Sequence, residues 1–574
     1  MSIAETRRPQ IFPQLKPAEI ERLHRFGDVK HFADGDALFR IGEAGHGLFV
    51  ILAGKVALFR NDHSGGRTQF HTHEAGAILG ELSQLSGRPA LVDGYAVGPV
   101  EGLHLPPDRL RALLVAEAEL GERIMRCLIL RRVSMLEMGT GGPIIVGRPD
   151  NPDAIRLEGF LMRNGHPRQR LNPDADPEAR ALIERFEVDQ SQLPIVLCPG
   201  GQLLRNPTEN ELARCIGLVG AIDPNRVYDT VVVGAGPAGL ATAVYAASEG
   251  LSVLALDCRS FGGQAGASAR IENYLGFPTG ITGLALMGRA YNQAQKFGVE
   301  MAIPDEVKSL ESGCSGSGHF VLRLATDERV TARSVVIASG ARYRRFGVKD
   351  LDLFEASSVH YWASPLEGKL CAGQEVVLVG GGNSAGQAVV YLADKVAKVW
   401  HLVRGPSLEA SMSRYLIDRI SGLSNVEVVT QAAVSGLEGR DGALEAVRWR
   451  LKKSGQEVRQ PIRHLFLFIG AEPNTDWLAG SGIELDAKGF VLSGQDCEEG
   501  NEGWLLETSR KGVFAIGDVR AGSVKRVAAA VGEGAQVVAA LHRYLSNVVG
   551  QRSAVMACPI AKRMMGLSPA VPAL

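Results

Sequence analysis

Two glycine-rich turns in this 574-residue chain have the residue types and spacing that bind the phosphates of a nucleotide. The first, GAGPAG at residues 234–239, follows the β-branched run TVVV and opens a helical pattern. Glycines there allow a tight turn and a close approach of the backbone to a pyrophosphate, whose charge the helix N-terminus stabilises. Asp257 ends the next strand, where a carboxylate accepts hydrogen bonds from a ribose. The spacing therefore favours a dinucleotide site over a structural turn.

The second turn, GGGNSA at residues 380–385, also follows an apolar strand and precedes a helical pattern. Its second strand ends VWHLVRG, so Arg404 stands where the first turn has Asp257. An arginine at this place suits the 2′-phosphate of NADPH, and the pattern favours NADPH over NADH without excluding NADH. The alternative for Arg404 is a solvated surface charge.

These turns need strands and helices to hold them, and the chain supplies both twice. The segment from Tyr228 reads as strand, glycine turn, helix and strand, and the segment from Gln374 repeats that order. Two such units predict two α/β Rossmann-type dinucleotide-binding domains in a multi-domain protein. Upstream, short strands separated by turns predict a β-roll, and residues 107–138 predict a long helical segment with an apolar stripe.

The second half of the chain, residues 228–545, resembles the low-molecular-weight thioredoxin reductase family of flavoproteins. Matching words run in the family's order, among them VGAGPAGLATAVYAA, FGGQAG, IENYLGFP, VVLVGGGNSA, FLFIGAEPNT and GVFAIGDVR. The resemblance implies an FAD-binding domain split over 226–341 and 466–546, with the NAD(P)H-binding domain, 342–465, between them. It implies that FAD is bound by Gly234, Gly236, Pro237, Ala238, Gly239, Asp257, Gly263, Gln264, Asn273, Gly517 and Asp518. It implies that the nicotinamide nucleotide is bound by Gly380, Gly382, Asn383, Ser384 and Arg404.

The chain departs from this family at two places. The family carries two arginines in series for the 2′-phosphate, and the second of them is Gly405 here. The family's redox-active CxxC maps onto Trp362–Pro365, in the stretch HYWASPLEG, and no CxxC occurs anywhere in the sequence. Neither tryptophan nor proline can form a thiolate or a disulfide, so no side chain is assigned a catalytic role. Cys371 is the nearest thiol and is interpreted as a buried small hydrophobe.

The N-terminal residues, 1–138, resemble a cyclic nucleotide-binding domain through the words FADGDALFRIGEAGHGLFVILAGKVALF and GAILGELSQLSGRPALVDGYAV. The family's arginine after the cassette proline is Ala90 here, which leaves Arg88 as the nearby substitute for pairing with a phosphate. The alternative is a degenerate scaffold that makes contacts between subunits. The resemblance implies that cyclic AMP or cyclic GMP is bound by Gly80, Glu81, Leu82, Ser83 and Arg88.

The middle of the chain, residues 142–220, resembles a small α/β unit of the thioredoxin or glutathione transferase type. The resemblance implies that Pro194, in SQLPIVLC, is that fold's cis-proline and that Cys198 is a core residue. The CxxC of the fold is absent, so we expect a docking or spacer module. The tail, 549–574, carries no pattern of a fold.

Charge and composition argue against several classes of partner. The chain has 62 Lys+Arg and 63 Asp+Glu, which gives no electrostatic reason to expect a nucleic acid. We expect no membrane partner and a cytoplasmic location, because neither a long apolar run nor a secretory signal is present. The eight scattered cysteines are then expected to be reduced. His71 and His73 share a strand face without a third ligand, so they are expected to be exposed residues and no metal is predicted.

The sequence thus predicts an oxidoreductase in which NAD(P)H reduces FAD by hydride transfer and the cofactors carry the chemistry. In one hypothesis the acceptor is ferredoxin, flavodoxin or a quinone. In a second it is a thiol protein, reduced through Cys371, Cys198 or its own thiols. A third hypothesis is a redox or cyclic-nucleotide sensor with little turnover. A homodimer is expected from symmetry and from the family.

Overall fold

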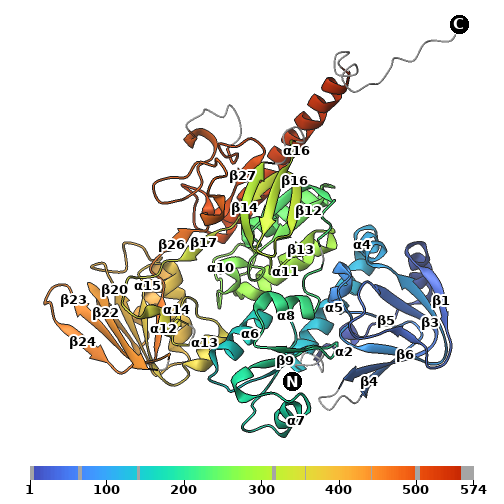
Figure 1. Ribbon diagram of the computed structural model, residues 1–574, viewed down its shortest axis with the longest axis horizontal. Coiled ribbons are helices and arrows are strands. Elements are labelled where there is room, and N and C mark those ends of the chain that lie inside the picture. The colour runs from blue at the N-terminus through green and yellow to red at the C-terminus, as the bar shows by residue number, and fades with distance from the viewer. Residues whose placement is uncertain are drawn as a thin grey trace. The chain divides into compact units, whose positions relative to one another are not determined.

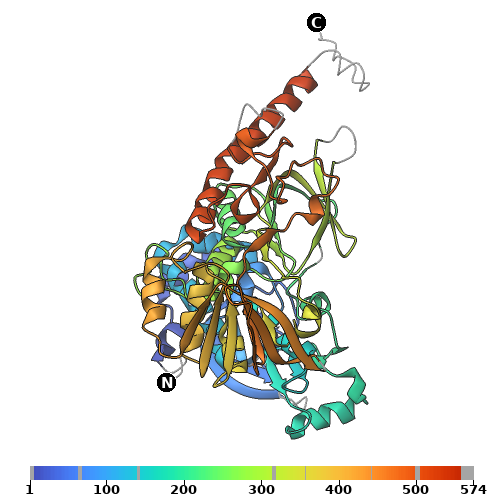
Figure 2. The same ribbon diagram turned by 90° about the vertical axis from the view of Figure 1, so that its left-hand side faces the viewer.

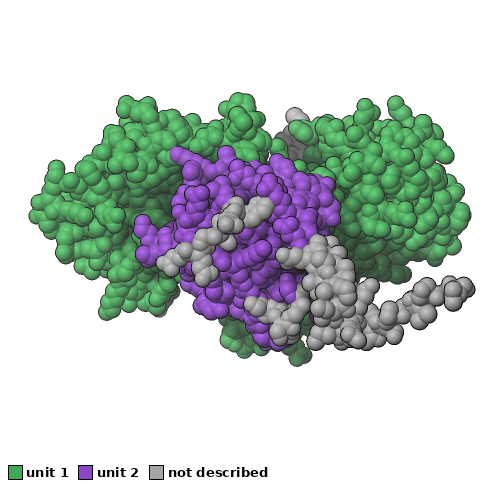
Figure 3. Space-filling view, turned by 90° about the horizontal axis from the view of Figure 1, so that it is seen from above, with its two compact units in different colours: residues 1–221, 257–305, 341–472 green, residues 222–256, 306–340, 473–574 purple. Residues whose placement is uncertain are grey.

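The computed structural model describes residues 6–61, 67–138, 142–220, 222–312, 318–355, 357–440, 442–497 and 505–557. The chain divides into two compact units, which are coloured green and purple in Figure 3. Unit 1 comprises residues 1–221, 257–305 and 341–472, and unit 2 comprises residues 222–256, 306–340 and 473–574. Within the described ranges, no helix is both long and apolar enough to cross a membrane.

Unit 1 begins with a six-stranded antiparallel sheet, blue in Figure 1, which is the β-roll that the strand pattern predicts. Alternate side chains of its longest strand, such as Leu48 and Val50, are fully buried in the core together with Leu103. The order is β1-β6-β3-β4, with β2 beside β6 and β5 beside β3. The strands are β1 (Asp28–Phe32), β2 (Ala37–Phe39), β3 (Leu48–Asn61), β4 (Arg67–Glu74), β5 (Ile78–Leu79) and β6 (Asp93–Leu105).

The predicted helical segment 107–138 is broken at Glu117. This residue has φ −111° and ψ 88°, outside the helical region, and its carboxylate accepts hydrogen bonds from Arg22 and Arg25. A buried carboxylate needs such partners, and the break lets it reach them. Leu128 of the second helix packs into the β-roll core. The helices of this part are α2 (Arg8–Ile11), α3 (Pro17–Leu23), η1 (His24–Phe26), η2 (Leu82–Ser86), α4 (Pro107–Ala116) and α5 (Ala118–Met138).

A four-stranded sheet of order β10-β9-β7-β8 follows and forms the small α/β unit. Its strand β7 runs parallel to β8 and antiparallel to β9. The peptide bond between Leu193 and Pro194 is cis, which confirms that prediction. The elements are β7 (Ile144–Val146), α6 (Pro152–Arg163), β8 (Gln169–Leu171), α7 (Pro177–Arg185), η3 (Gln190–Gln192), β9 (Ile195–Leu197), β10 (Leu203–Arg205) and α8 (Glu209–Cys215).

Two cysteines of this unit form a disulfide, so the prediction that all cysteines are reduced is wrong here. Cys198 directly follows β9, and Cys215 is the last residue of α8. Their Cα atoms are 6.4 Å apart and their sulfur atoms are bonded. Cys198 is buried, as expected of a core residue, but it is one half of a covalent link between a strand and a helix.

Loss of this disulfide is expected to destabilise the small α/β unit. The link joins residues separated by 17 positions, and closing a loop of that length is worth about 3 kcal/mol. We expect Cys198→Ser to increase amide hydrogen exchange in β7 and β9 by about a hundredfold. The matched control is Cys258→Ser, which changes an exposed cysteine outside the disulfide. Equal exchange in the two variants would show that the link adds no stability.

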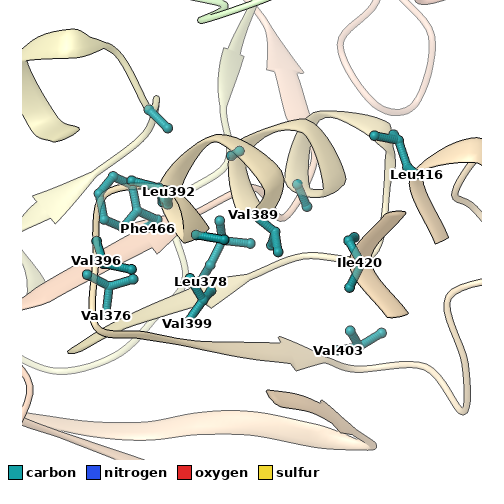
Figure 4. Close-up of a cluster of buried hydrophobic side chains, with 14 of the residues drawn as sticks. Val376, Leu378, Val389, Leu392, Val396, Val399, Val403, Leu416, Ile420 and Phe466 are labelled. Carbon is teal, nitrogen blue, oxygen red and sulfur yellow. The ribbon is translucent and has the colours of Figure 1, made fainter. Parts of the chain in front are cut away.

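The last segment of unit 1, residues 341–472, contains a five-stranded parallel sheet of order β18-β25-β19-β20-β21. Figure 4 shows one side of its core, where Val376 and Leu378 lie near Val389 of the covering helix and Phe466 of the next strand. Strands covered by helices in this way read as apolar runs, which is why the sequence marks them. A second sheet, β22-β23-β24, is antiparallel.

The elements of these two segments of unit 1 are as follows. Residues 257–305 hold α10 (Gly263–Gly266), α11 (Gly283–Lys296) and β13 (Glu300–Ala302). The parallel sheet and its helices comprise α12 (Leu351–Phe354), β18 (Val359–His360), α13 (Pro365–Leu370), β19 (Glu375–Val379), α14 (Asn383–Ala393), β20 (Lys398–Val403), α15 (Arg414–Ser421), β21 (Val426–Thr430) and β25 (His464–Leu467). The other strands are β17 (Ala341–Tyr343), β22 (Ala432–Arg440), β23 (Ala443–Leu451), β24 (Glu457–Gln460) and β26 (Ala471–Pro473).

Unit 2 is built on a sheet in which β12, β11, β16 and β27 run parallel and β15 and β14 continue one side. Its long helix α16 is seen in red in Figure 2 and ends at Ala557. The predicted tail from residue 549 therefore starts inside this helix, and residues 558–574 lie outside the described part. The elements are β11 (Val227–Val233), α9 (Pro237–Ser248), β12 (Val253–Leu256), β14 (Val307–Ser312), β15 (Phe320–Leu324), β16 (Arg329–Ile337), η4 (Asp476–Leu478), η5 (Gly494–Asp496), β27 (Val513–Ala515), η6 (Gly517–Val519) and α16 (Val527–Ala557).

Candidate functional site

The first glycine turn lies in unit 2, between the end of β11 and the start of α9. Gly234 has φ +113°, and a Cβ there would stand 2.1 Å from the carbonyl oxygen of Ala338. A Cβ on Gly239 would stand 1.8 Å from the carbonyl oxygen of Gly234, so both positions admit glycine alone. Gly236 is the N-cap of α9, and no side chain caps it. The first N–H groups of the helix therefore stay available to an anion, as a pyrophosphate site requires.

Helix α9 and the loop after β27 pack closely in unit 2. A Cβ on Gly517 would stand 2.9 Å from the Cβ of Ala238, which follows Pro237 in the first turn of α9. The backbone N–H of Gly517 donates to Glu533 at 2.6 Å, which fixes the loop to α16. Burial raises the pKa of the neighbouring Asp518 carboxyl, although Lys525 opposes the shift. These residues of the predicted FAD set fit a dinucleotide. Their glycines allow a close approach of the backbone at positions where any Cβ atom would collide with its neighbours.

Four other residues of the predicted FAD set lie in unit 1. Asp257 follows β12 directly, and its carboxylate accepts hydrogen bonds from the backbone N–H groups of Arg259 and Ser260. Gly263 and Gln264 begin the short helix α10. The side-chain amide of Gln264 donates a hydrogen bond to the backbone carbonyl of Ala341. Asn273 is exposed.

The second glycine turn lies in unit 1, between β19 and α14. Gly380 has φ +150°, and a Cβ there would stand 2.4 Å from the carbonyl oxygen of Phe468. Gly382 is the N-cap of α14 without a side-chain cap, and a Cβ on it would meet no atom within 4 Å. The side chain of Asn383 accepts a hydrogen bond from the N–H of Ser413 at 2.7 Å. The turn thus repeats the open helix N-terminus of the first, as a second pyrophosphate site requires.

Arg404 directly follows β20 and is exposed. Among the described residues it has no hydrogen bond or ion pair, so its guanidinium is available to a phosphate. Ser384, in the first turn of α14, is exposed as well. Buried His401, on β20, lies 2.7 Å from the carbonyl oxygen of Gly380 through its Nε2 and links the strand to the turn.

The stretch that aligns with the family's two cysteines is a turn centred on a buried carboxylate. The indole N–H of Trp362 donates to Glu367 at 2.9 Å, and the backbone N–H of Ser364 donates to the other oxygen of the same carboxylate at 2.9 Å. The guanidinium of Arg163, at the end of α6, lies 5.6 Å from the centroid of the Trp362 ring. Such stacking is typical of arginine and adds a second contact to the indole. The turn from Trp362 to Glu367 is therefore held by side-chain hydrogen bonds and contains no cysteine.

Cys371 lies in the same segment and is fully buried, which confirms its interpretation as a small core residue. Burial raises the pKa of its thiol to about 11, so the group is protonated near neutral pH. Its Sγ donates to the carbonyl oxygen of Glu367 at 3.0 Å. A protonated, buried thiol is not a nucleophile in thiol–disulfide exchange.

We therefore expect the Cys371→Ser variant to keep at least half of the NAD(P)H-dependent turnover. A serine hydroxyl can donate the same hydrogen bond, and a thiol that stays protonated carries no electrons to an acceptor. Steady-state oxidation of NADPH with a quinone acceptor measures the effect. Cys127→Ser is the matched control, since Cys127 is also a buried thiol that donates to a backbone carbonyl. A loss of more than tenfold in the Cys371 variant alone would make this thiol part of the electron path.

A cavity of about 290 Å³ opens beside the Trp362 turn, within unit 1. It brings together Trp362, Gln264 and Ser384, which come from three separate stretches of the sequence. Arg419 lines the cavity and pairs with Glu272 at 2.7 Å. Sequence reasoning missed three further lining residues, because no motif contains them: Arg270, Tyr391 and Arg419.

The residues of the predicted phosphate cassette in the β-roll bond to other residues of the chain. Glu81 pairs with Arg132 of α5 at 2.7 Å, and Ser83 donates to the same carboxylate. Arg88 donates to the hydroxyl of Tyr291 on α11 at 2.6 Å. Gly80 and Leu82 complete the cassette: Arg131, also of α5, donates to the carbonyl of Gly80, and Leu82 packs against the β-roll core. No sequence pattern singles out these two arginines of α5.

The two strand histidines are not the exposed pair that the alternation predicts. His73 is buried, and the ring of Phe12 lies 5.7 Å from its centroid and 4.3 Å from that of His71. Burial lowers the pKa of His73 to about 2, so this imidazole is neutral. The N-terminal helix α2 brings Phe12 over the strand, which no local pattern could reveal. In the described part of the chain, no group of three side chains could hold a metal ion.

Two family models match the chain. One, described as pyridine nucleotide-disulphide oxidoreductase, matches residues 228–534, and the other, described as cyclic nucleotide-binding domain, matches residues 29–117. An alkyl hydroperoxide reductase protein of Escherichia coli (strain K12) is 30% identical over 318 residues, which are 55% of this chain and 58% of that protein. Thioredoxin reductase of Mycolicibacterium smegmatis is 30% identical over 322 residues, which are 56% of this chain and 97% of that protein.

Solved structures give the same result. Thioredoxin reductase of Lactococcus lactis in its FR conformation has a TM-score of 0.51 and 26% identity, and covers 56% of this chain and 99% of its own. That of T. acidophilum has a TM-score of 0.51 and 29% identity, and covers 56% of this chain and 100% of its own. The chain spans just under three fifths of the length of the alkyl hydroperoxide reductase protein, but all or nearly all of these thioredoxin reductases.

The matched region is more than half of the chain and includes both glycine turns. Each turn has the open helix N-terminus and the collision-free backbone that a dinucleotide needs. The chain therefore belongs to the pyridine nucleotide-disulphide oxidoreductase family and, within it, to the thioredoxin reductase type, and it also carries an N-terminal cyclic nucleotide-binding domain.

Proposed function

We propose that this chain is an FAD-dependent oxidoreductase that passes electrons from NAD(P)H to an acceptor without a cysteine pair at the position of the family's CxxC. The observation that carries the proposal is the Trp362–Glu367 turn, which replaces two sulfurs with an indole, a hydroxyl and a buried carboxylate. A tryptophan held by Glu367 cannot exchange with a disulfide. The Cys198–Cys215 disulfide takes no part in this proposal, so the acceptor is reduced directly rather than through a mixed disulfide.

The residues of the chain would bind and orient FAD and the nicotinamide nucleotide. FAD, when bound, would supply the chemistry of accepting a hydride and donating electrons. The first glycine turn and Asp257 would hold FAD, and the second turn with Arg404 would hold the nicotinamide nucleotide. Glu367 fixes the indole of Trp362 at one wall of the 290 Å³ cavity.

The cavity beside Trp362 favours a small acceptor with a flat ring. Its volume is near the lower end of the range for small-molecule pockets, and Tyr391 and Phe468 supply aromatic walls. Arg270 lines the same cavity and pairs there with Glu272 at 3.5 Å. A quinone head group has this size and carries oxygen atoms that accept hydrogen bonds. Ferredoxin and flavodoxin are the protein alternatives, and their reduction would not need the cavity.

Anaerobic stopped-flow mixing tests the proposal. We expect NADPH, and NADH more slowly, to bleach the flavin, and menadione to restore its absorbance in a second mixing step. Ferredoxin, flavodoxin and oxidised thioredoxin are then mixed in turn with the reduced protein. Restoration by oxidised thioredoxin at the rate seen with menadione would overturn the proposal, because a protein disulfide would then be an acceptor.

A second candidate function is regulation by the N-terminal domain, and the contact between Arg88 and Tyr291 favours it. This hydrogen bond joins the phosphate cassette to α11, which belongs to the region matched by the oxidoreductase model. A cyclic phosphate that paired with Arg88 would take the guanidinium from Tyr291. Titration with cyclic AMP and with cyclic GMP, monitored by the rate of flavin reduction, tests the idea. A rate that changes equally in the wild type and in Arg88→Ala would contradict it.

A further inference from the structure

A second cavity of unit 1, about 940 Å³ in volume, is lined by no residue of the two glycine turns, but Leu82, Ser83 and Arg88 of the phosphate cassette lie at its edge. Its two long walls are α5 and α11, both labelled in Figure 1. Lining residues of α5 recur every three or four positions, as do those of α11 from Leu284 to Lys296, so each helix presents one continuous stripe. The volume is at the upper end of the range for sites that bind small molecules.

The walls of this cavity are apolar. The α4 and α5 side contributes Leu114, Val115, Met125, Ile129, Val133 and Leu136. The other side contributes Leu218, Phe261 and Leu284. Two of these side chains are poorly covered by the protein, because Val115 is 58% exposed and Leu284 is 38% exposed. Uncovered apolar surface that lines a cavity is surface that a ligand can bury.

The charges at the same cavity are almost all positive. The cations are Arg7, Arg88, Arg126, Arg132, Arg289 and Lys296. Among the described lining residues Glu122 is the sole acid, and Arg126 already pairs with it. Arg132 pairs with Glu81, which lies outside the lining. The excess of positive charge selects an anion over a neutral or cationic ligand.

Two cations of α11 have no acidic partner within the described residues. Arg289 lies 5.7 Å from the ring centroid of Phe277, and Lys296 lies 5.7 Å from that of Phe297. Neither makes an ion pair or a side-chain hydrogen bond there. They are two turns apart on the α11 stripe, so an anionic head can meet a cation at either place while its tail follows the apolar wall.

We propose that this cavity binds a long-chain carboxylate, with its acyl chain between α5 and α11 and its head group at the α11 cations. The proposal goes beyond electron transfer, because no cofactor turn lines the cavity. An acyl chain can bury the apolar side chains of α4 and α5 that line the cavity, which the polar base and sugar of a nucleotide would not cover as well. Arg88 also lines the cavity, so the ligand would lie beside the contact between the phosphate cassette and Tyr291.

Fluorescence titration of the FAD-bound full-length chain with an intrinsically fluorescent C18 polyene carboxylic acid, below its micelle concentration, tests the proposal. We expect saturable binding of one molecule per chain and displacement by laurate, myristate and palmitate. Affinity should rise by up to about fourfold for each added methylene group. Dodecanol, which has the tail of laurate but no charge, should bind at least tenfold more weakly. None of these readouts requires turnover, so they can fail or succeed independently of the proposed electron transfer.

Two sets of variants test the contacts of the acyl chain and those of the carboxylate separately. Val115→Glu and Leu284→Glu change exposed side chains, so the fold should survive, and each should weaken laurate binding at least tenfold. Val97→Glu, which changes an exposed valine outside the cavity, is the matched control. The double variant Arg289→Gln/Lys296→Gln should reduce laurate affinity to that of dodecanol and leave dodecanol unchanged. Its control is Arg109→Gln, which removes a cation of α4 that does not line the cavity.

Four results would overturn the proposal. The first is the absence of saturable binding, and the second is binding that both glutamate variants leave intact. The third is binding of the protein to vesicles of phosphatidylglycerol and phosphatidylcholine without binding of the monomeric acid. The fourth is a mass in light scattering that falls from dimer to monomer in Leu284→Glu while the wild type ignores laurate. That last pattern would assign the cavity walls to a second copy of the chain.

Discussion

Replacing Gly234 by alanine is expected to yield a folded protein that does not retain FAD. The new Cβ would stand 2.1 Å from the carbonyl oxygen of Ala338, and the φ of +113° is strained for any residue with a side chain. Together these move the turn that faces the pyrophosphate. A cost of about 3 kcal/mol on the bound conformation weakens FAD binding by roughly a hundredfold. The ratio of flavin to protein absorbance, followed by titration of the apoprotein with FAD, measures the loss.

Gly250→Ala is the control for this prediction. Gly250 has φ +90°, but a Cβ there would meet no other atom within 4 Å. The control therefore carries the backbone strain of the first variant without the collision, and it lies after α9, away from the turn. We expect it to lower the melting temperature and to keep its FAD. If both variants lost FAD equally, general destabilisation rather than the turn would be the cause.

The Arg404→Ala variant is expected to lose most of its preference for NADPH. The guanidinium is exposed at the end of β20 and unpaired in the described structure, so its removal disturbs no packing. A charge-assisted hydrogen bond to a phosphate is worth about 1.5–3 kcal/mol, so KM for NADPH should rise roughly tenfold to a hundredfold. We expect kcat and the KM for NADH to change less than twofold, because the 2′-phosphate takes no part in hydride transfer.

Two further variants sharpen this test. Gly405→Arg supplies the second arginine of the family's pair and should lower KM for NADPH several-fold. Lys395→Ala removes an exposed cation from the loop before the same strand and should change neither nucleotide. Steady-state kinetics with NADPH and with NADH, at a fixed concentration of acceptor, give the ratio of the two KM values for the wild type and for each of the three variants. An equal rise of KM for NADPH and NADH in Arg404→Ala would place this arginine outside the 2′-phosphate site.

The glycine turns could be predicted because their requirement is local. Gly234 and Gly380 are each followed within five residues by the start of a helix, and both positions exclude a Cβ for steric reasons that any sequence with this fold must meet. The cis bond before Pro194 was predicted from the resemblance of its segment to the thioredoxin or glutathione transferase fold, and the burial of Cys371 from its residue type. The residues that bind phosphates lie on short turns, so spacing alone was informative.

The contacts that join distant parts of the chain could not be predicted in this way. Arg88 and Tyr291 are separated by 203 positions, and nothing near either residue marks its partner. The break at Glu117 depends on two arginines near the N-terminus, and the burial of His73 depends on Phe12. Helical and strand periodicity report which face is apolar, but they do not report what covers it.

The ion pair between Glu81 and Arg132 sets a threshold for any nucleotide that the N-terminal domain binds through Glu81. The two side chains are 9% and 13% exposed, so displacing Arg132 leaves a buried guanidinium without its carboxylate. A competing ribose hydroxyl must first offset that loss, which at about 1–3 kcal/mol reduces its apparent affinity roughly five- to 150-fold. Such a domain would bind little cyclic nucleotide at a low concentration and would respond only to a large rise in the nucleotide concentration.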